Sequence, residues 1–303
     1  RMTEEIRTNG RDPEVIAPVQ ADLAISTQNL SLSYQGKPAL RDVTTNIYNG
    51  EIVALMGRNG AGKSSLLTTL VGLNKEAKGT SEICGRSSKD LKGKARREIV
   101  GFIPQEPSDL LYGQSVKDEC AQADKDNECA AGTALALLER IVPAIDPNTH
   151  PRDLSEGQRL ALALAIVLSA QPQVLILDEP TAVLTPQETD ELLNTMRDLK
   201  SKGTSIIFIT HKLREVRAVA DQITIIRRGK VVAAVLPETS EAELASMMAG
   251  RAVDLAPEKY PHEMGSAILE VKNLTVRDAL GTAIVKSVNF HVNAGEVLAV
   301  AGV

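Results

Sequence analysis

Hydrophobic and polar residues follow two different patterns along the chain. From Leu23 to Ile52 they alternate, which is typical of half-buried β-strands, and Gln35-Gly36-Lys37-Pro38 interrupts the alternation with a predicted turn. Later strands are predicted as continuous apolar runs, which indicate burial on both faces of a sheet. The buried strands are predicted at 52–56, 174–177 and 204–209, the last of them apolar from Ile206 on, and helical patterns lie at 64–71, 130–142 and 186–199. Strands that alternate with helices predict an α/β fold with a mostly parallel sheet.

The end of the chain repeats its beginning. Asn29-Leu30-Ser31-Leu32 returns as Asn273-Leu274-Thr275-Val276, and Gly50-Glu51-Ile52-Val53-Ala54-Leu55 returns as Gly295-Glu296-Val297-Leu298-Ala299-Val300. Such a repeat predicts a second copy of the same domain. We therefore expect a leader or linker at 1–22, a complete domain at 23–236, a joint at 237–265 and the start of a second copy at 266–303. Gly302 aligns with Gly57, so we expect the second copy to continue beyond Val303.

Composition narrows the class of protein. Of the 303 residues, 43% are hydrophobic and only 2% are aromatic, so a base-stacking nucleic-acid surface is not expected. The net charge of −5 also argues against binding to nucleic acid or anionic lipid. The longest apolar run, Leu160–Leu168, is too short to span a bilayer, and the N-terminal residues lack the apolar segment of a signal peptide. The three cysteines form no CxxC pair, so neither a zinc site nor a disulfide framework is predicted.

A glycine-rich motif follows the first continuous apolar run. Residues 57–64 read Gly57-Arg58-Asn59-Gly60-Ala61-Gly62-Lys63-Ser64, which fits the phosphate loop G-x-x-x-x-G-K-[ST] between a strand and a helix. Glycines let successive backbone N–H groups point at phosphate oxygens, and the helix N-terminus adds positive potential. We predict that Lys63 binds the β- and γ-phosphates and that Ser64 ligates Mg²⁺. The alternative is a glycine-rich turn that fits the motif by chance.

Two further predicted strands end in residues with catalytic chemistry. Val174–Leu177 is followed by Asp178 and Glu179, and Ile206–Thr210 is followed by His211. Because parallel strands place their carboxyl ends at the ligand crevice, we predict that Asp178 holds Mg²⁺. Glu179 is the predicted general base toward the attacking water, and His211 is predicted to bond the γ-phosphate. For His211, a solvated loop residue is the alternative.

Ser155-Glu156-Gly157-Gln158 precedes a helical pattern that runs to about Ser169. Ser155 and Gln158 fit a capping box, in which the side chains serve only to close the helix N-terminus. The other interpretation is that this helix start, with a hydroxyl and a glycine backbone, binds a phosphate. Both interpretations remain open from these residues alone.

Taken in order, these strings resemble the ATP-binding-cassette (ABC) ATPases. The matching strings are 57–64, Gln105 in Phe-Ile-Pro-Gln, 154–158, Asp178-Glu179-Pro180-Thr181 and His211. The resemblance covers 23–236 as a whole domain and 266–303 as the start of another. It implies a P-loop NTPase fold with a RecA-like parallel sheet core, an antiparallel β subdomain and a helical signature subdomain at about 106–160. It also implies ATP and Mg²⁺ as cofactors.

The resemblance implies roles for individual residues as well. Tyr34 would stack on adenine, and Gln105 would link Mg²⁺ and water to the helical subdomain. Ser155, Gly157 and Gln158 would contact the ATP of a partner domain across a head-to-tail nucleotide sandwich. The expected catalytic residues are Lys63, Gln105, Glu179 and His211; the expected nucleotide-binding residues are Tyr34, Gly57, Arg58, Asn59, Gly60, Ala61, Gly62, Lys63, Ser64, Ser65, Ser155, Gly157 and Gln158; and the expected metal ligands are Ser64, Gln105 and Asp178.

Two positions depart from the pattern of the family. Glu156 stands where the signature usually has glycine, and we expect its carboxylate to face away from the phosphate. Thr185 stands where an aspartate usually follows the Asp-Glu pair. The strings around Thr185 and after His211 resemble the tandem ATPases of sugar and nucleoside importers. Residues from about 30 to 177 instead resemble energy-coupling-factor importers of vitamins or metals, so the two halves indicate different substrate classes.

Three classes of function fit an ABC ATPase. We predict an importer ATPase that powers uptake of a small solute, a sugar or nucleoside first and a vitamin or metal as the alternative. The second class is a soluble tandem protein that acts on ribosomes; it would carry a long charged helical linker, whereas 237–265 is short and contains prolines. The third class is a DNA-repair protein; it would carry zinc modules or long coiled coils, and the sequence shows neither pattern. The expected partners are transmembrane permease subunits, a second ABC ATPase domain in tandem or in trans, and a solute-binding protein, with no nucleic acid. The expected location is cytoplasmic, peripheral at the inner face of the cell membrane.

Overall fold

The computed structural model describes residues 22–143, 145–251, 265–278 and 281–300. The chain divides into two units, Arg1–Val253 and Asp254–Val303, and each is considered by itself. The predicted leader or linker at 1–22, apart from Asp22, lies outside the described residues, as do Gly302 and residues 252–264 of the predicted joint. Within the described part of the chain, no helix combines the length and the apolar character needed to cross a bilayer.

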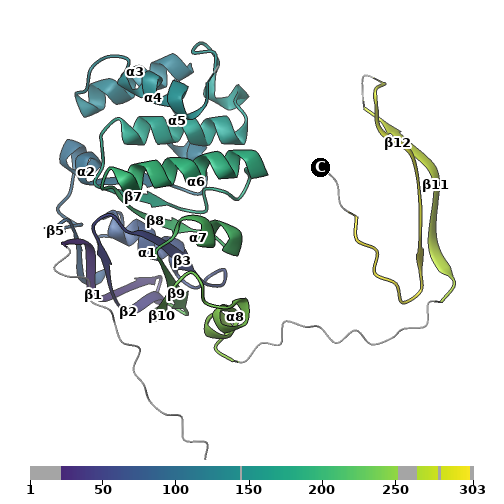
Figure 1. The fold of residues 1–303 in the computed structure, drawn as a ribbon, viewed down its shortest axis with the longest axis horizontal. Coiled ribbons are helices and arrows are strands. Elements are labelled where there is room, and N and C mark those ends of the chain that lie inside the picture. The colour runs from purple at the N-terminus through teal and green to yellow at the C-terminus, as the bar shows by residue number, and fades with distance from the viewer. Residues whose placement is uncertain (1–21, 144, 252–264, 279–280, 301–303) are drawn as a thin grey trace, which may run out of the picture. The chain divides into compact units, whose positions relative to one another are not determined.

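A six-stranded sheet forms the centre of the first unit (Figure 1). Its spatial order is β10 (Lys230–Val235), β9 (Gln222–Arg227), β3 (Ile52–Met56), β8 (Ser205–Ile209), β7 (Val174–Leu177) and β6 (Val100–Ile103). All neighbours from β9 to β6 are parallel, and β10 joins the edge in the antiparallel direction. Every residue of β3, β7 and β8 is buried, because this sheet is covered on both faces. The predicted α/β fold with a mostly parallel sheet is confirmed.

The register of the parallel strands brings their carboxyl ends level. Leu55 in β3 lies opposite Ile209 in β8. Leu177 in β7 lies opposite Phe208 on one side and Ile103 of β6 on the other. A predicted motif begins within two residues of the end of each of these strands, so the phosphate loop, the Asp-Glu pair and the histidine share one edge of the sheet.

An antiparallel sheet packs over one face of the parallel sheet. Its spatial order is β2 (Lys37–Tyr48), β1 (Leu23–Tyr34), β4 (Lys78–Ile83) and β5 (Arg86–Ser87). The turn between β1 and β2 is only Gln35 and Gly36, both with positive φ. The prediction that the turn extends through Pro38 is wrong, because Lys37 already pairs with Tyr34. A two-residue turn with two positive φ angles matches the twist of the strands it joins.

Hydrophobic side chains fill both faces of the six-stranded sheet. The leucines of α1 (Lys63–Leu70) pack between this sheet and the antiparallel one. The opposite face is covered by α5 (Glu156–Leu168), α6 (Pro186–Ser201), α7 (Leu213–Val219) and α8 (Glu241–Ala249). Successive strand residues point alternately into the hydrophobic cores on the two faces of the sheet, as the two-residue period of a strand requires. The strand ends are therefore held rigidly from both sides.

A helical group lies beyond one edge of the sheet (Figure 1). It consists of α3 (Val116–Asn127) and α4 (Thr133–Ile141) packed on α5. Leu162 of α5 packs on α3 and α4, whereas Leu164 packs toward the sheet, so α5 fastens the group to the rest of the unit. The remaining short elements are α2 (Gly93–Ile99), η1 (Pro107–Leu110) and η2 (Pro151–Asp153). The group occupies the region of the predicted helical subdomain, and α5 continues to Leu168.

The second unit contains a hairpin that repeats the first one. Its strands are β11 (Ala267–Arg277) and β12 (Ala283–Asn293). Leu274 lies opposite Val288 just as Leu30 lies opposite Val43, and both hairpins have register shifts directly before and after this pair. The pairing irregularities therefore recur together with the sequence.

A backbone-to-side-chain bond is repeated in the same hairpins. The N–H of Asp42 donates to Ser31 Oγ at 2.9 Å, and the N–H of Ser287 donates to Thr275 Oγ1 at 3.0 Å. In each case, the donor residue has a positive φ. The internal repeat thus extends from residue types to strand register and local hydrogen bonding.

Candidate nucleotide-binding and catalytic site

The phosphate loop connects β3 to α1 at the carboxyl edge of the sheet. Two of its glycines are required by close packing. A Cβ on Gly57 would lie 2.2 Å from the carbonyl oxygen of Ile226, and a Cβ on Gly62 would lie 2.6 Å from that of Ala39. Gly62 also has a φ of +105°, which residues with side chains rarely adopt. Among the other loop residues, Arg58, Asn59 and Gly60 are exposed and Ala61 is buried.

Helix α1 begins with backbone donors that have no partner within the helix. Its N-cap residue, Gly62, has no side chain that could cap it, and the N–H of Leu66 donates to Gly62 as the helix starts. The N–H groups of Lys63, Ser64 and Ser65 therefore remain available. Because a helix N-terminus combines such donors with a positive dipole end, this geometry fits a phosphate group.

Lys63 is buried within the loop, with 6% of its surface exposed. Its Nζ donates to the carbonyl oxygens of Gly57 at 2.9 Å and Arg58 at 3.4 Å. Burial lowers the pKa of Lys63, and the carboxylates of Glu179 and Asp178 act in the opposite direction. The loop therefore holds a partly desolvated ammonium beside two carboxylates.

Asp178 is also buried, and its Oδ1 has no hydrogen-bond partner. Burial raises the pKa of Asp178, helped by the charge of Glu179 and opposed by the Ser64 hydroxyl and the Lys63 ammonium. A buried carboxylate oxygen beside a hydroxyl fits Mg²⁺, which prefers oxygen ligands and is held by one or two carboxylates together with substrate phosphates. The described residues contain no cluster of three or more His, Cys, Asp or Glu side chains that could hold a metal ion without other ligands.

Asp178→Asn is expected to raise the thermal stability of the protein at neutral pH when nucleotide and Mg²⁺ are absent. An acid whose pKa is raised by folding destabilises the fold when it is ionised, so removal of the charge removes that cost. The destabilisation is complete above the raised pKa and vanishes as the pH falls below the ordinary value of 3.8. Melting temperatures of the variant and of the unmodified protein, measured from neutral to acidic pH, should become equal as the pH falls below 3.8. A variant that is less stable than the unmodified protein at pH 7 would contradict this account.

Glu179 and His211 are in direct contact. Nε2 of His211 lies 2.9 Å from Oε1 of Glu179, and their side chains are 40% and 23% exposed, so water and substrate can reach both. Glu179 has a φ of +49°, a conformation that costs a non-glycine residue about 1–2 kcal/mol. Such backbone strain tends to occur at functional sites. The structure thus brings Lys63, Asp178, Glu179 and His211 together at one sheet edge.

Gln105 follows β6, the strand beside β7, and its side chain is exposed. The N–H of Asp178 donates to the carbonyl oxygen of Ile103 at 3.0 Å, which ties the ends of these two strands together. Because η1 begins at Pro107, Gln105 lies between the sheet edge and the helical group. No hydrogen bond joins its side chain to another described residue, so its role toward Mg²⁺ stays a prediction.

Ser155 and Gln158 form a capping box at the start of α5. Ser155 Oγ accepts from the N–H of Gln158 at 3.2 Å, and Gln158 Oε1 accepts from the N–H of Ser155 at 2.9 Å. The structural interpretation of these residues is therefore confirmed, and their contact with a phosphate stays a prediction. Glu156 forms an ion pair with Arg159 at 3.0 Å on the same helix.

Gly157 faces α6 of the same chain. A Cβ at this position would lie 2.0 Å from Glu188 Oε1. The Glu188 carboxylate belongs to the capping box of α6, in which Thr185 is the N-cap residue. Within the described residues, no hydrogen bond or ion pair joins Ser155, Gly157 or Gln158 to the strand-edge cluster. The contact of these three residues with the ATP of a partner domain stays a prediction.

Tyr34 ends β1 at the hairpin turn, and 44% of it is exposed. Its O–H donates to Asn74 Oδ1 at 3.4 Å, and the Asn74 amide donates to Thr68 and Thr69 in α1. The ring thus has an exposed face beside the segment that follows α1. No side-chain hydrogen bond joins Tyr34 to the described residues of the phosphate loop, and its stacking on adenine stays a prediction.

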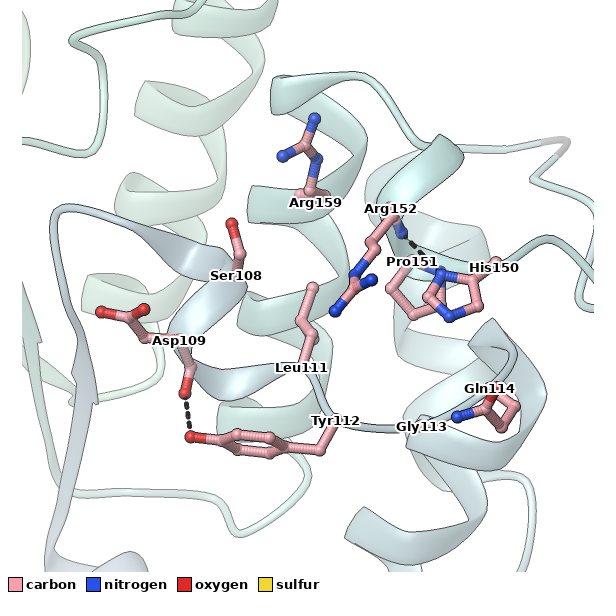
Figure 2. Close-up of a pocket in the computed structure, with 10 residues that line it drawn as sticks. All are labelled: Ser108, Asp109, Leu111, Tyr112, Gly113, Gln114, His150, Pro151, Arg152 and Arg159. Carbon is pink, nitrogen blue, oxygen red and sulfur yellow. Dashed lines mark hydrogen bonds between the residues drawn. The ribbon is translucent and has the colours of Figure 1, made fainter.

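A cavity of about 480 Å³ opens on the helical group, as Figure 2 shows. Leu111 and Tyr112 line it from the segment after η1, and Arg152 and Arg159 line it from η2 and α5. The Tyr112 hydroxyl bonds the backbone oxygen of Asp109. Because none of the predicted nucleotide, catalytic or metal residues lines this cavity, the candidate site is defined by the strand ends.

Sequence reasoning missed a buried acid next to the site. Glu215 in α7 is 2% exposed and accepts hydrogen bonds from Thr181 and Thr210. One signal could have revealed it: Glu215 lies four residues before Val219, on the same buried face of the helix. A charged residue on an apolar helical face indicates burial with a partner.

Known proteins share both sequence and fold with this chain. Residues 40–182 match the family model described as ABC transporter. The nucleoside import ATP-binding protein NupA of Lactococcus lactis is 38% identical over 272 residues, which cover 86% of this chain and 53% of that protein. The xylose import ATP-binding protein XylG of Histophilus somni is 34% identical over 294 residues, which cover 92% and 58%. The chain thus spans about half the length of these curated relatives.

Two solved structures have the same arrangement of sheet and helices. One, described as the ATP binding subunit of an ABC transporter, is 26% identical with a TM-score of 0.67 and covers 75% of this chain and 99% of its own. The other is cbiO1 from Clostridium perfringens, described as part of the ABC transporter complex cbiONQ; it is 28% identical with a TM-score of 0.61 and covers 72% and 90%. Together with the phosphate loop and the strand-edge carboxylates, these matches show that the chain belongs to the ABC transporter family, as one of its ATP-binding proteins.

Proposed function

We propose that this chain binds and hydrolyses ATP to power an ABC importer. The observation that carries the proposal is the cluster of Lys63, Asp178, Glu179 and His211 at the carboxyl edge of the parallel sheet. An ammonium, a buried carboxylate with one oxygen left without a hydrogen bond, and a carboxylate–imidazole pair are groups suited to phosphoryl transfer to water. A purely structural role gives no reason to bury Lys63 and Asp178 side by side.

Each group of the cluster has its own task in this proposal. Lys63 and the backbone N–H groups of the loop bind the β- and γ-phosphates. Asp178 and Ser64 hold Mg²⁺, which when bound neutralises charge on the phosphates. Glu179 accepts a proton from the attacking water. His211 orients the Glu179 carboxylate and bonds the γ-phosphate.

Residues outside the cluster complete the proposed nucleotide site. Tyr34 stacks on adenine, and Gln105 connects Mg²⁺ and water to the helical group. Ser155, Gly157 and Gln158 contact the ATP held by a second domain. The phosphate loop contributes Gly57, Arg58, Asn59, Gly60, Ala61, Gly62 and Ser65 in addition to Lys63 and Ser64.

The same proposal covers domains and partners. The ATPase domain spans 23–236, the joint spans 237–265, and a second copy begins at 266. The repeated strand register in β11 and β12 supports this second copy. The proposed partners are transmembrane permease subunits, a second ABC ATPase domain and a solute-binding protein, with the chain at the inner face of the cell membrane.

A sugar or a nucleoside is the favoured cargo. Relatives named for nucleoside and xylose import align over 86% and 92% of this chain, so they match both of its halves. The alternative is an energy-coupling-factor importer of a vitamin or metal, which residues from about 30 to 177 resemble. Action on ribosomes is the alternative from a different class.

The proposal is tested with the intact protein and its permease in vesicles. Uptake of labelled ribose, xylose, adenosine, cobalt and a vitamin is measured in two conditions, with ATP and Mg²⁺ enclosed in the vesicles and with ATP and Mg²⁺ in the external buffer. We expect ATP-dependent uptake of a sugar or nucleoside. Uptake confined to cobalt or the vitamin would favour the alternative importer class. Co-sedimentation with ribosomes without any uptake would overturn the transport assignment.

A further inference from the structure

Glu215 joins the two loops that carry the candidate catalytic pair. Its Oε2 accepts from Thr181 Oγ1 at 2.8 Å and from Thr210 Oγ1 at 2.5 Å. Thr181 follows Glu179 by two residues, and Thr210 directly precedes His211. One buried carboxylate thus spans from the loop after β7 to the loop after β8.

Lys212 closes this network from the other side. Its Nζ donates to the carbonyl oxygen of Thr181 at 2.8 Å and lies 3.3 Å from Glu215 Oε1. Its backbone N–H donates to Thr210 Oγ1 at 3.1 Å. A buried carboxylate is costly unless it is paired and hydrogen-bonded. The hydrogen bonds of the Glu215 carboxylate all go through Oε2 to the two loops, and Oε1, which has no hydrogen-bond partner, faces the Lys212 ammonium as an ion pair.

The catalytic pair needs such an anchor. Glu179 and His211 are both partly exposed, and Glu179 has a strained backbone, so their mutual contact is not held by packing around the side chains. Catalytic groups have to be kept within about 0.5 Å of their working geometry by supporting residues whose own positions are locked. The buried side chains of Thr181, Thr210 and Glu215, which are hydrogen-bonded to one another, supply this support within two residues of the pair along each loop.

We propose that Glu215 is a positioning residue that holds Glu179 and His211 at contact distance for water activation. This inference rests on the proposed ATPase function. Glu215 touches neither nucleotide nor water in this scheme and acts through Thr181 and Thr210. Loss of its charge loosens the Glu179–His211 contact and leaves the phosphate-binding groups in place.

The test compares kcat and KM for ATP in five forms of the intact protein: unmodified, Glu215→Gln, Thr210→Val, Thr210→Ser and Glu119→Gln. Glu119 is the matched control, because it is a buried glutamate in α3 with a backbone partner, Gly113, in the helical group. Glu215→Gln and Thr210→Val are expected to lower kcat about 10–100-fold, by analogy with the loss of a residue that orients a metal ligand through a hydrogen bond, with little change in KM. Thr210→Ser keeps the hydroxyl and should retain kcat.

Three results would overturn the positioning role. These are an unchanged kcat in Glu215→Gln, a loss in Thr210→Ser as large as in Thr210→Val, and an equal loss in Glu119→Gln. A second readout does not depend on turnover: the ring ¹⁵N resonances of His211 in the nucleotide-free protein should move in Glu215→Gln and stay in place in Glu119→Gln. If the unmodified protein hydrolyses no ATP, the proposed function fails, whereas the ring resonances still decide whether Glu215 positions His211.

Discussion

A Glu179→Gln variant is expected to hydrolyse ATP about 10²–10⁴-fold more slowly than the unmodified protein. Glutamine keeps the size of the side chain and an oxygen facing His211, but it cannot take a proton from water. Affinity for ATP should stay within a few-fold, because Lys63 and the loop N–H groups bind the phosphates. Phosphate release under saturating ATP measures the first effect, and equilibrium titration with nucleotide measures the second.

Glu82→Gln is the control for this experiment. Glu82 is an exposed acid in β4 of the antiparallel sheet, and its replacement changes the net charge by the same amount. We expect it to leave both turnover and affinity unaltered. Turnover of Glu179→Gln that matches the unmodified protein, in the presence of its permease, would exclude Glu179 as the general base.

Replacement of Lys63 by alanine is expected to weaken ATP binding itself. A hydrogen bond to a charged group is worth about 1.5–3 kcal/mol, so its loss should raise the Kd for ATP about 10–150-fold. The two protein contacts of the ammonium, to the carbonyl oxygens of Gly57 and Arg58, are lost at the same time. Calorimetric titration with ATP in the presence of Mg²⁺ measures the change, and thermal unfolding verifies that the variant folds.

Lys78→Ala provides the comparison for Lys63→Ala. Lys78 is an exposed lysine at the start of β4, and its removal changes the net charge equally. It should bind ATP with unchanged affinity. If Lys63→Ala also binds ATP as tightly as the unmodified protein, residues 57–64 are not the phosphate loop of this chain.

Local motifs predicted most of the strand-edge site, because a parallel sheet converts sequence order into spatial proximity. Asp178, Glu179 and His211 are recognisable as candidate site residues only because each lies within two residues of the end of a buried apolar strand. Once the strands pair in parallel, the residues after them have to meet at one edge. The capping box of Ser155 and Gln158 was equally predictable, because it depends on contacts within four residues.

Contacts between distant segments could not be predicted in this way. Glu215 becomes a buried link only when α7 packs beside the ends of β7 and β8. Gly157 meets Glu188 only because α5 and α6 pack side by side on the same face of the sheet. The hairpin turn was predicted to be two residues too long for a related reason. Whether Lys37 pairs with Tyr34 depends on how the two strands twist around each other, and this cannot be read from the turn residues alone.

The sequence by itself determined the buried strands β3, β7 and β8 and the main helices between them, where the glycine-rich motif lies, which residues follow the buried strands, and that the beginning of the chain is repeated at its end. These features depend on hydrophobic period and on short-range chemistry, both of which are visible in the residue order. Tertiary structure alone decided the burial of Asp178 and Lys63, the contact between Glu179 and His211, and the network around Glu215. Burial and the resulting pKa changes depend on what packs over a residue, and that information is spread across segments far apart in the chain.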